Sequence, residues 1–160
     1  MLESGQKIGL WHRMIGEVNG LDDCKSYYTA LPARLIEYIN DETGDSLYYQ
    51  ELARQLKDPS DQEMVLEFAR DEAGHANAFR QVYRQVTGTE APLARIAPPR
   101  LPGYCAAIKE RIRAESDDLV KYGQEAAAAF DPELQKLFYL TSLAEGKHGL
   151  RLTTLLCGVK

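Results

Sequence analysis

Two of the three histidines in this 160-residue chain follow a glutamate by three positions, and both pairs occupy equivalent places in an internal repeat. The two halves of the repeat are related by a shift of about 73 positions. Its acidic and histidine members are Glu42, Glu72 and His75 in the first half and Glu115, Glu145 and His148 in the second. Tyr49, Asp58 and Gln62 likewise coincide with Tyr122, Asp131 and Gln135. Four carboxylates and two imidazoles from four helices are the ligand set of a two-metal carboxylate site in a helical bundle.

Each of the four repeated glutamates interrupts a stripe of apolar residues spaced three or four positions apart, as on the buried face of a helix. Around Glu42, for example, the stripe includes Ile39 and Tyr49. Most glutamates are solvated surface residues, which is the alternative interpretation. A buried carboxylate without a partner is costly and must be neutralised by a proton or a cation. The histidines one helical turn further on favour a cation. Glu37 and Glu110 also repeat, but they fall on another face and are predicted to be surface residues.

A site rich in oxygen ligands and poor in nitrogen suits iron or manganese, whereas a structural zinc site is more often rich in thiolates. By symmetry, Glu72 and Glu145 are predicted to bridge two ions and to matter most for catalysis. Glu42 and Glu115 are then terminal ligands. We expect two iron ions, with manganese as the alternative. Such a pair can reduce dioxygen or hydrogen peroxide by two electrons, one from each ion.

The composition excludes several other classes of protein. A net charge of −5 with a pI near 5.3 disfavours a nucleic-acid partner. No apolar run approaches the roughly 20 residues that span a bilayer, and residues 1–30 do not resemble a secretory signal. Cys24, Cys105 and Cys157 form no Cys-x-x-Cys pair, which fits a reducing compartment. A cytoplasmic protein without nucleic-acid or membrane partners is therefore expected.

The course of the chain predicts an all-α fold, because helix-forming residues dominate. Residues 1–31 are predicted to form an N-terminal extension with a short helix at 8–18, and residues 32–157 a four-helix bundle. The predicted bundle helices are about 32–57, 60–87, 103–130 and 132–156, with Pro32 in the first turn of the first helix. Ser60 with Glu63 is a possible capping box, and Gly88 a helix stop. Asp131 is expected to cap the last helix. Two hairpins joined by the proline-rich segment 88–102 have ferritin-like connectivity.

The segments DEAGHA (71–76) and AEGKH (144–148), together with Glu42 and Glu115, resemble the rubrerythrin branch of the ferritin-like superfamily. The resemblance covers about residues 33–157. It implies a non-haem diiron centre that reduces hydrogen peroxide or, in other branches, oxidises ferrous iron, and it implies a homodimer. It also implies that Tyr49 and Tyr122 hydrogen-bond to the ligand carboxylates and so contribute to the catalytic site. From the sequence alone they are equally good core aromatic residues.

The chain departs from the rubrerythrin pattern at two points. Rubrerythrins usually carry a rubredoxin-type domain with paired Cys-x-x-Cys motifs, and the 160 residues contain none, so a separate electron-donor protein is expected. Rubrerythrins also have an extra glutamate three residues after the ligand that corresponds to Glu115. Here that place is taken by Asp118, whose equivalent in the first half is Asp45. Both are candidate ligands with a shorter reach.

Three hypotheses about function follow. The leading one is a diiron oxidoreductase that acts on hydrogen peroxide or dioxygen. The second is a ferroxidase or iron-handling protein of ferritin type, which a large iron load per chain would distinguish. The third is a non-catalytic helical bundle that the metal only stabilises, which predicts metal-dependent stability without redox turnover.

Overall fold

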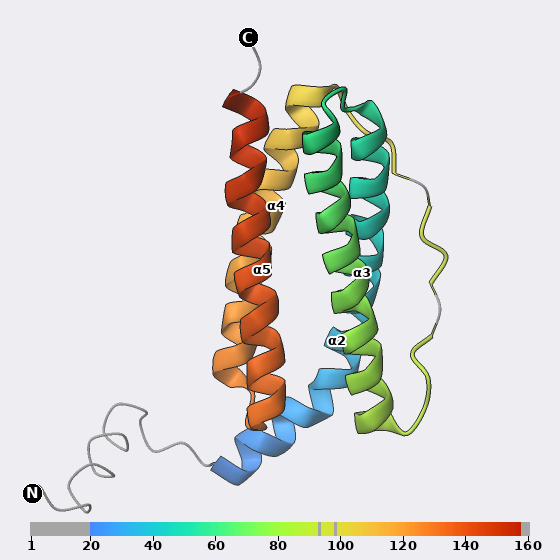
Figure 1. Ribbon diagram of the computed structural model, residues 1–160. Helices are drawn as coiled ribbons and strands as arrows, with labels where there is room; N and C mark the ends of the chain where they lie inside the picture. The colour runs from blue at the N-terminus through green and yellow to red at the C-terminus, as the bar shows by residue number, and fades with distance from the viewer. Residues whose placement is uncertain (1–19, 93, 98, 158–160) are drawn as a thin grey trace, which may run out of the picture.

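The computed structural model describes residues 20–92, 94–97 and 99–157, which form a bundle of four long helices without strands (Figure 1). The helices are α2 (Gly20–Gln55), α3 (Pro59–Thr87), α4 (Tyr104–Ala128) and α5 (Pro132–Cys157). α2 packs along α3 and α4 along α5, so the bundle consists of two hairpins. The segment between α3 and α4 runs the length of the bundle on its outside (Figure 1). The predicted all-α, ferritin-like bundle with a long crossover is therefore confirmed.

The internal repeat is visible in the two hairpin turns, where equivalent residues make equivalent contacts. The carboxylate of Asp58 accepts a hydrogen bond from the backbone N–H of Asp61 at 3.3 Å, and that of Asp131 accepts one from the N–H of Leu134 at 2.9 Å. The side-chain amides of Gln62 and Gln135 each donate to a backbone carbonyl six residues earlier, at 2.6 Å. The cap predicted at Asp131 is thus confirmed. The capping box predicted at Ser60 is wrong, because Asp58 caps α3 and Pro59 takes its first position.

The start of the first bundle helix was predicted wrongly. α2 begins at Gly20, twelve residues before Pro32, which lies inside the helix. Proline at the first turn is common, but a proline within a helix is tolerated at the cost of one backbone hydrogen bond and a kink. Residues before Pro32 run at an angle to the rest of α2 (Figure 1). α2 therefore crosses the predicted division between residues 31 and 32. The helix predicted at 8–18 lies outside the described residues.

The other helix ends agree with the predictions to within about two residues. Gly88 ends α3 with a φ of 72°, a conformation that glycine adopts without a steric penalty, and its N–H donates to the carbonyl of Arg84. Over its described residues, the segment 88–103 contains no helix. No described helix is both long and apolar enough to cross a membrane.

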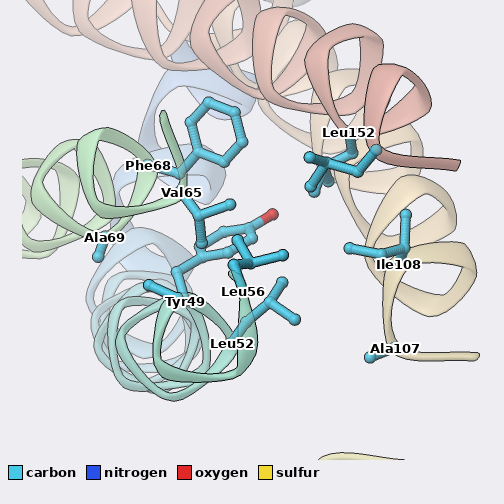
Figure 2. Close-up of a cluster of buried hydrophobic side chains, with 11 residues drawn as sticks. Tyr49, Leu52, Leu56, Val65, Phe68, Ala69, Ala107, Ile108 and Leu152 are labelled. Atoms are coloured by element: carbon cyan, nitrogen blue, oxygen red, sulfur yellow. The ribbon is translucent and has the colours of Figure 1, made fainter. Parts of the chain in front are cut away.

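Two apolar clusters fill the bundle, and the predicted ligands lie between them along each helix. One cluster includes Leu52, Phe68, Ile108 and Leu152 (Figure 2). The other is built from residues nearer the opposite end of the bundle, Leu35, Phe79, Ala129 and Phe138 among them. In α3, Glu72 therefore follows the first cluster's Phe68 and precedes the second cluster's Phe79. The polar layer is enclosed by apolar packing from both ends, which restricts access of water.

Candidate metal centre

All six predicted ligands converge in the middle of the bundle. Glu42 comes from α2, Glu72 and His75 from α3, Glu115 from α4, and Glu145 and His148 from α5. Residues three apart on a helix lie on the same face, which is why each Glu-x-x-His pair points both side chains inward. The four carboxylates and His148 are at most 3% exposed, and the side chain of His75 is 15% exposed. By contrast, Glu37 and Glu110 are exposed, as predicted.

The convergent side chains form two groups whose potential ligand atoms lie within 4.8 Å of one another. One group is Glu42, Glu72, His75 and Glu145, and the other is Glu72, Glu115, Glu145 and His148. Glu72 and Glu145 belong to both.

The shared carboxylates direct one oxygen to each group. Oε2 of Glu72 lies 3.0 Å from Nδ1 of His75, and its Oε1 lies 3.0 Å from Nδ1 of His148. Glu145 does the same, with Oε1 at 3.1 Å from His75 and Oε2 at 3.3 Å from His148. This is the orientation that a carboxylate needs to bridge two ions.

Four buried donor or acceptor atoms of the centre have no hydrogen-bond partner. They are Oε1 of Glu72, Oε2 of Glu115, Oε1 of Glu145 and Nδ1 of His148. Buried polar atoms are normally satisfied, so each unsatisfied one calls for an explanation. All four face the interior of the two groups. A pair of cations bonded to these oxygens and nitrogens would satisfy them together, so the residues fit a dinuclear metal centre.

The family comparison agrees with this geometry. The family model described as Rubrerythrin matches residues 35–156, more than half of the chain. The chain belongs to the rubrerythrin family. The match covers all six convergent residues and most of the four helices. Comparison with curated proteins and with solved structures gave no match.

Two tyrosines link the hairpins of this rubrerythrin-family bundle. The hydroxyl of Tyr49 on α2 donates a hydrogen bond to Oε1 of Glu115 on α4. Symmetrically, the hydroxyl of Tyr122 on α4 donates to Oε1 of Glu42 on α2. Both rings are fully buried. Each bond occupies one oxygen of a carboxylate and leaves the other, Oε2, facing the group to which that carboxylate belongs.

Burial and neighbouring charges shift the pKa values of the convergent side chains strongly. Burial raises the pKa of Glu42 to about 7. Burial also disfavours charge on Glu115, but His148 and Arg111 outweigh it and lower that pKa to about 2. Burial favours neutral imidazoles, yet the surrounding carboxylates raise the pKa of both His75 and His148 to about 12.

Arg111, which was not predicted from the sequence, places a guanidinium cation beside the centre. This arginine is 6% exposed and lies four residues before Glu115, to whose Oε1 its Nη2 donates at 2.6 Å. Nη1 and the same Nη2 donate to the two carboxylate oxygens of Asp45, at 2.6 and 2.8 Å, and Nε donates to the hydroxyl of Tyr49 at 3.2 Å. The signal in the sequence was the spacing of Arg111 and Glu115, which places both on one helix face.

The two candidate aspartates are not brought into the groups of ligand atoms. Asp45 pairs with Arg111, and Asp118 pairs with Nζ of Lys121 at 2.5 Å. Neither belongs to the two groups found among the described residues. Each aspartate is one methylene shorter than a glutamate and lies next to a cationic side chain. It therefore forms an ion pair with that side chain and does not join the groups of ligand atoms.

The two histidines have different surroundings. Nε2 of the fully buried His148 lies 3.0 Å from the carboxylate of Asp71, which also accepts a hydrogen bond from Lys147 at 2.8 Å. This contact holds the ring with Nδ1 facing the centre, and a carboxylate behind a ligand histidine also makes the histidine a better donor. The sequence reasoning missed Asp71, although it directly precedes Glu72. Among the described residues, no carboxylate lies in the equivalent position behind His75, because the counterpart of Asp71 in the repeat is Ala144.

Proposed function

We propose that this rubrerythrin-family protein is a non-haem diiron oxidoreductase that reduces hydrogen peroxide or dioxygen. The observation that carries the proposal is the shared orientation of Glu72 and Glu145, each with one oxygen toward each histidine. Glu42 with His75 would complete one iron site, and Glu115 with His148 the other. Oxygen-rich sites with one imidazole per ion suit iron, and also manganese.

Two bound ferrous ions would supply one electron each, as many as one molecule of hydrogen peroxide needs, with two protons, to become two molecules of water. The chain's own part is to position and protect. Tyr49 and Tyr122 hold Glu115 and Glu42 by one oxygen each, so the other oxygen keeps its direction. The apolar clusters at both ends limit water, which strengthens the electrostatic interactions inside.

We further propose a separate electron-donor protein as partner, which would return electrons to the oxidised centre after each turnover. A homodimer in the cytoplasm is the proposed state, on the basis of the family. Sedimentation analysis of the natively purified protein tests the dimer. Reduction of the ferric protein by candidate rubredoxin-type donors tests the donor.

The decisive experiment mixes the ferrous-loaded protein with one equivalent of hydrogen peroxide in a stopped-flow instrument. Oxidation should be much faster than that of free ferrous ion, and the protein should hold about two irons per chain. Glu145→Gln, which keeps the shape but removes the bridging charge, should abolish the acceleration, whereas the surface control Glu37→Gln should not. Metal-dependent stability without any acceleration by peroxide or dioxygen would reject the oxidoreductase in favour of a metal-stabilised bundle. Retention of many irons per chain would instead indicate iron handling of ferritin type.

A further inference from the structure

A second buried polar cluster lies on α2 and α4, outside the proposed ligand set. Its centre is Glu125, 8% exposed and ten residues beyond Glu115 on α4. The hydroxyls of Tyr27 and Tyr38 donate to this carboxylate at 3.0 and 2.6 Å, and Arg34 donates to both of its oxygens at 2.6 and 3.3 Å. An ion pair with Arg34 alone would connect the two helices. The two phenol groups on the same carboxylate require another explanation.

The cluster is connected to the metal centre through aromatic rings. The ring of Tyr38 packs edge-on against that of Tyr122, with centroids 5.4 Å apart. Tyr122 in turn donates its hydroxyl hydrogen bond to Glu42 of the centre. Three phenols therefore follow one another from the centre to Tyr27, which is half-buried. Tyr27, Tyr38 and Glu125 line a surface groove of about 360 Å³.

Each phenol in this series has a carboxylate as its hydrogen-bond acceptor. Burial, together with Glu125, raises the pKa of Tyr27 and of Tyr38 above the ordinary value, so both stay protonated at neutral pH. A neutral phenol that loses an electron becomes a strong acid and gives up its proton at the same time. Glu125 is in place to accept that proton from either phenol.

We propose that Tyr38, with Glu125 as its proton acceptor, passes an oxidising equivalent from the metal centre to Tyr27 at the groove. The inference rests on the proposed diiron chemistry and applies when only one ferrous ion is available to a molecule of peroxide. Hydrogen peroxide then takes one electron from that ferrous ion and one from a tyrosine, and its O–O bond breaks. Glu125 keeps the proton released by the phenol, and with two protons from solvent two water molecules form, leaving one ferric ion and one tyrosyl radical. Electron transfer from Tyr27 through Tyr38 and Tyr122 places the radical at the surface, away from the ligands.

The test uses the full chain loaded with one ferrous ion per chain and mixed with one equivalent of hydrogen peroxide. Freeze-quenched samples are examined by electron paramagnetic resonance for a tyrosyl radical, and a nitroso spin trap marks its site for mass spectrometry. We expect adducts on Tyr27. In Tyr38→Phe, the ring stays but the O–H is lost, and labelling of Tyr27 should fall at least about tenfold, the effect of roughly 1.4 kcal/mol on a barrier. Glu125→Gln should have the same effect, because an amide is a poor proton acceptor.

Controls separate this inference from the proposed function. Tyr139→Phe removes an exposed tyrosine of α5 outside the cluster and should leave the labelling of Tyr27 unchanged. Iron content and thermal unfolding of each variant show whether the fold and centre persist. If peroxide oxidises the iron but Tyr27 is not labelled, or is labelled equally in Tyr38→Phe, the relay is overturned while the diiron function stands. If ferrous iron does not bind, or peroxide does not oxidise it, both are overturned.

Discussion

Replacement of Arg111 by methionine tests whether Glu115 is a metal ligand, because both a cation in the centre and Arg111 would neutralise the same carboxylate. Methionine keeps much of the length of the arginine side chain and removes its charge. In the ion-free protein, Glu115 then loses the donor at 2.6 Å, and Asp45 loses its paired hydrogen bonds at 2.6 and 2.8 Å. The side chains of Arg111 and Glu115 are 7% and 1% exposed, so water cannot solvate the carboxylate of Glu115 in place of the guanidinium.

Removal of one partner from a buried ion pair costs about 3–5 kcal/mol, and this is the expected loss of unfolding free energy in the ion-free protein. With metal bound, the ion neutralises Glu115, and only the partly exposed Asp45 remains without a partner. The loss should therefore be smaller in the metal-bound protein. By the thermodynamic cycle, a difference of about 1.4 kcal/mol means that the variant binds the ion about tenfold more tightly than the wild type.

Urea unfolding, followed by circular dichroism with and without manganese(II), measures both losses. The control is Arg54→Met, an exposed arginine paired with Glu51 at 2.5 Å, which should cost less than about 1 kcal/mol in both states. Equal losses for Arg111→Met with and without metal would mean that no bound ion neutralises Glu115, and the ligand assignment would be refuted.

Four further variants test the bridge, the support of one histidine and a helix cap. Glu145→Gln should lose both ions and Glu42→Gln only one, as measured by metal analysis after gel filtration; equal metal contents would contradict the bridging role. Asp71→Asn removes the charge behind His148 and should weaken metal affinity about 10–100-fold in a chelator competition, whereas an unchanged affinity would show that the contact does not orient the ring. Asp131→Ala should lower the unfolding free energy by about 1 kcal/mol with normal metal content, since the cap lies in a turn away from the centre.

The fold and the six convergent residues could be predicted because both follow from local rules. A carboxylate within an apolar helix stripe is buried wherever that stripe packs, and the repeat supplied the same test in both halves. Asp-Pro marked both turns. The aspartate caps the helix that follows, and proline fits the first helical position because its missing N–H is not needed there. The start of α2 could not be predicted in this way. Pro32 is compatible with a first turn and with a kink. The choice is made by packing, in which Tyr27 contacts Glu125 of α4 and Phe130 in the turn that follows α4.

Tyr49 and Tyr122 belong to the repeat. Arg111 beside the ligands and Glu125 in the second cluster could not be predicted from the repeat, because it does not extend to them. Arg111 corresponds to Tyr38, and the counterpart of Glu125 is Leu52. A single arginine near a glutamate is usually a solvent-exposed pair, and only the packed structure shows that this one is buried. Asp118 is the reverse case. Its position in the sequence made it a candidate ligand, but in the structure its carboxylate forms an ion pair with Lys121.

The two groups of ligands therefore have different surroundings. This difference bears on the side from which a metal ion or a small molecule would reach the centre. Arg111, Tyr49 and Asp71 all act on the group that contains Glu115 and His148, and the side chain of His148 is fully buried. For the other group, the residues that the structure describes supply only Tyr122 in a comparable role, and the side chain of its His75 is 15% exposed. Rigid ligands hold an ion in fixed geometry, whereas exchange with solvent requires an accessible donor atom. In the proposed diiron protein, ions and a small oxidant would therefore reach the centre from the side of His75, and the side of His148 would hold the geometry.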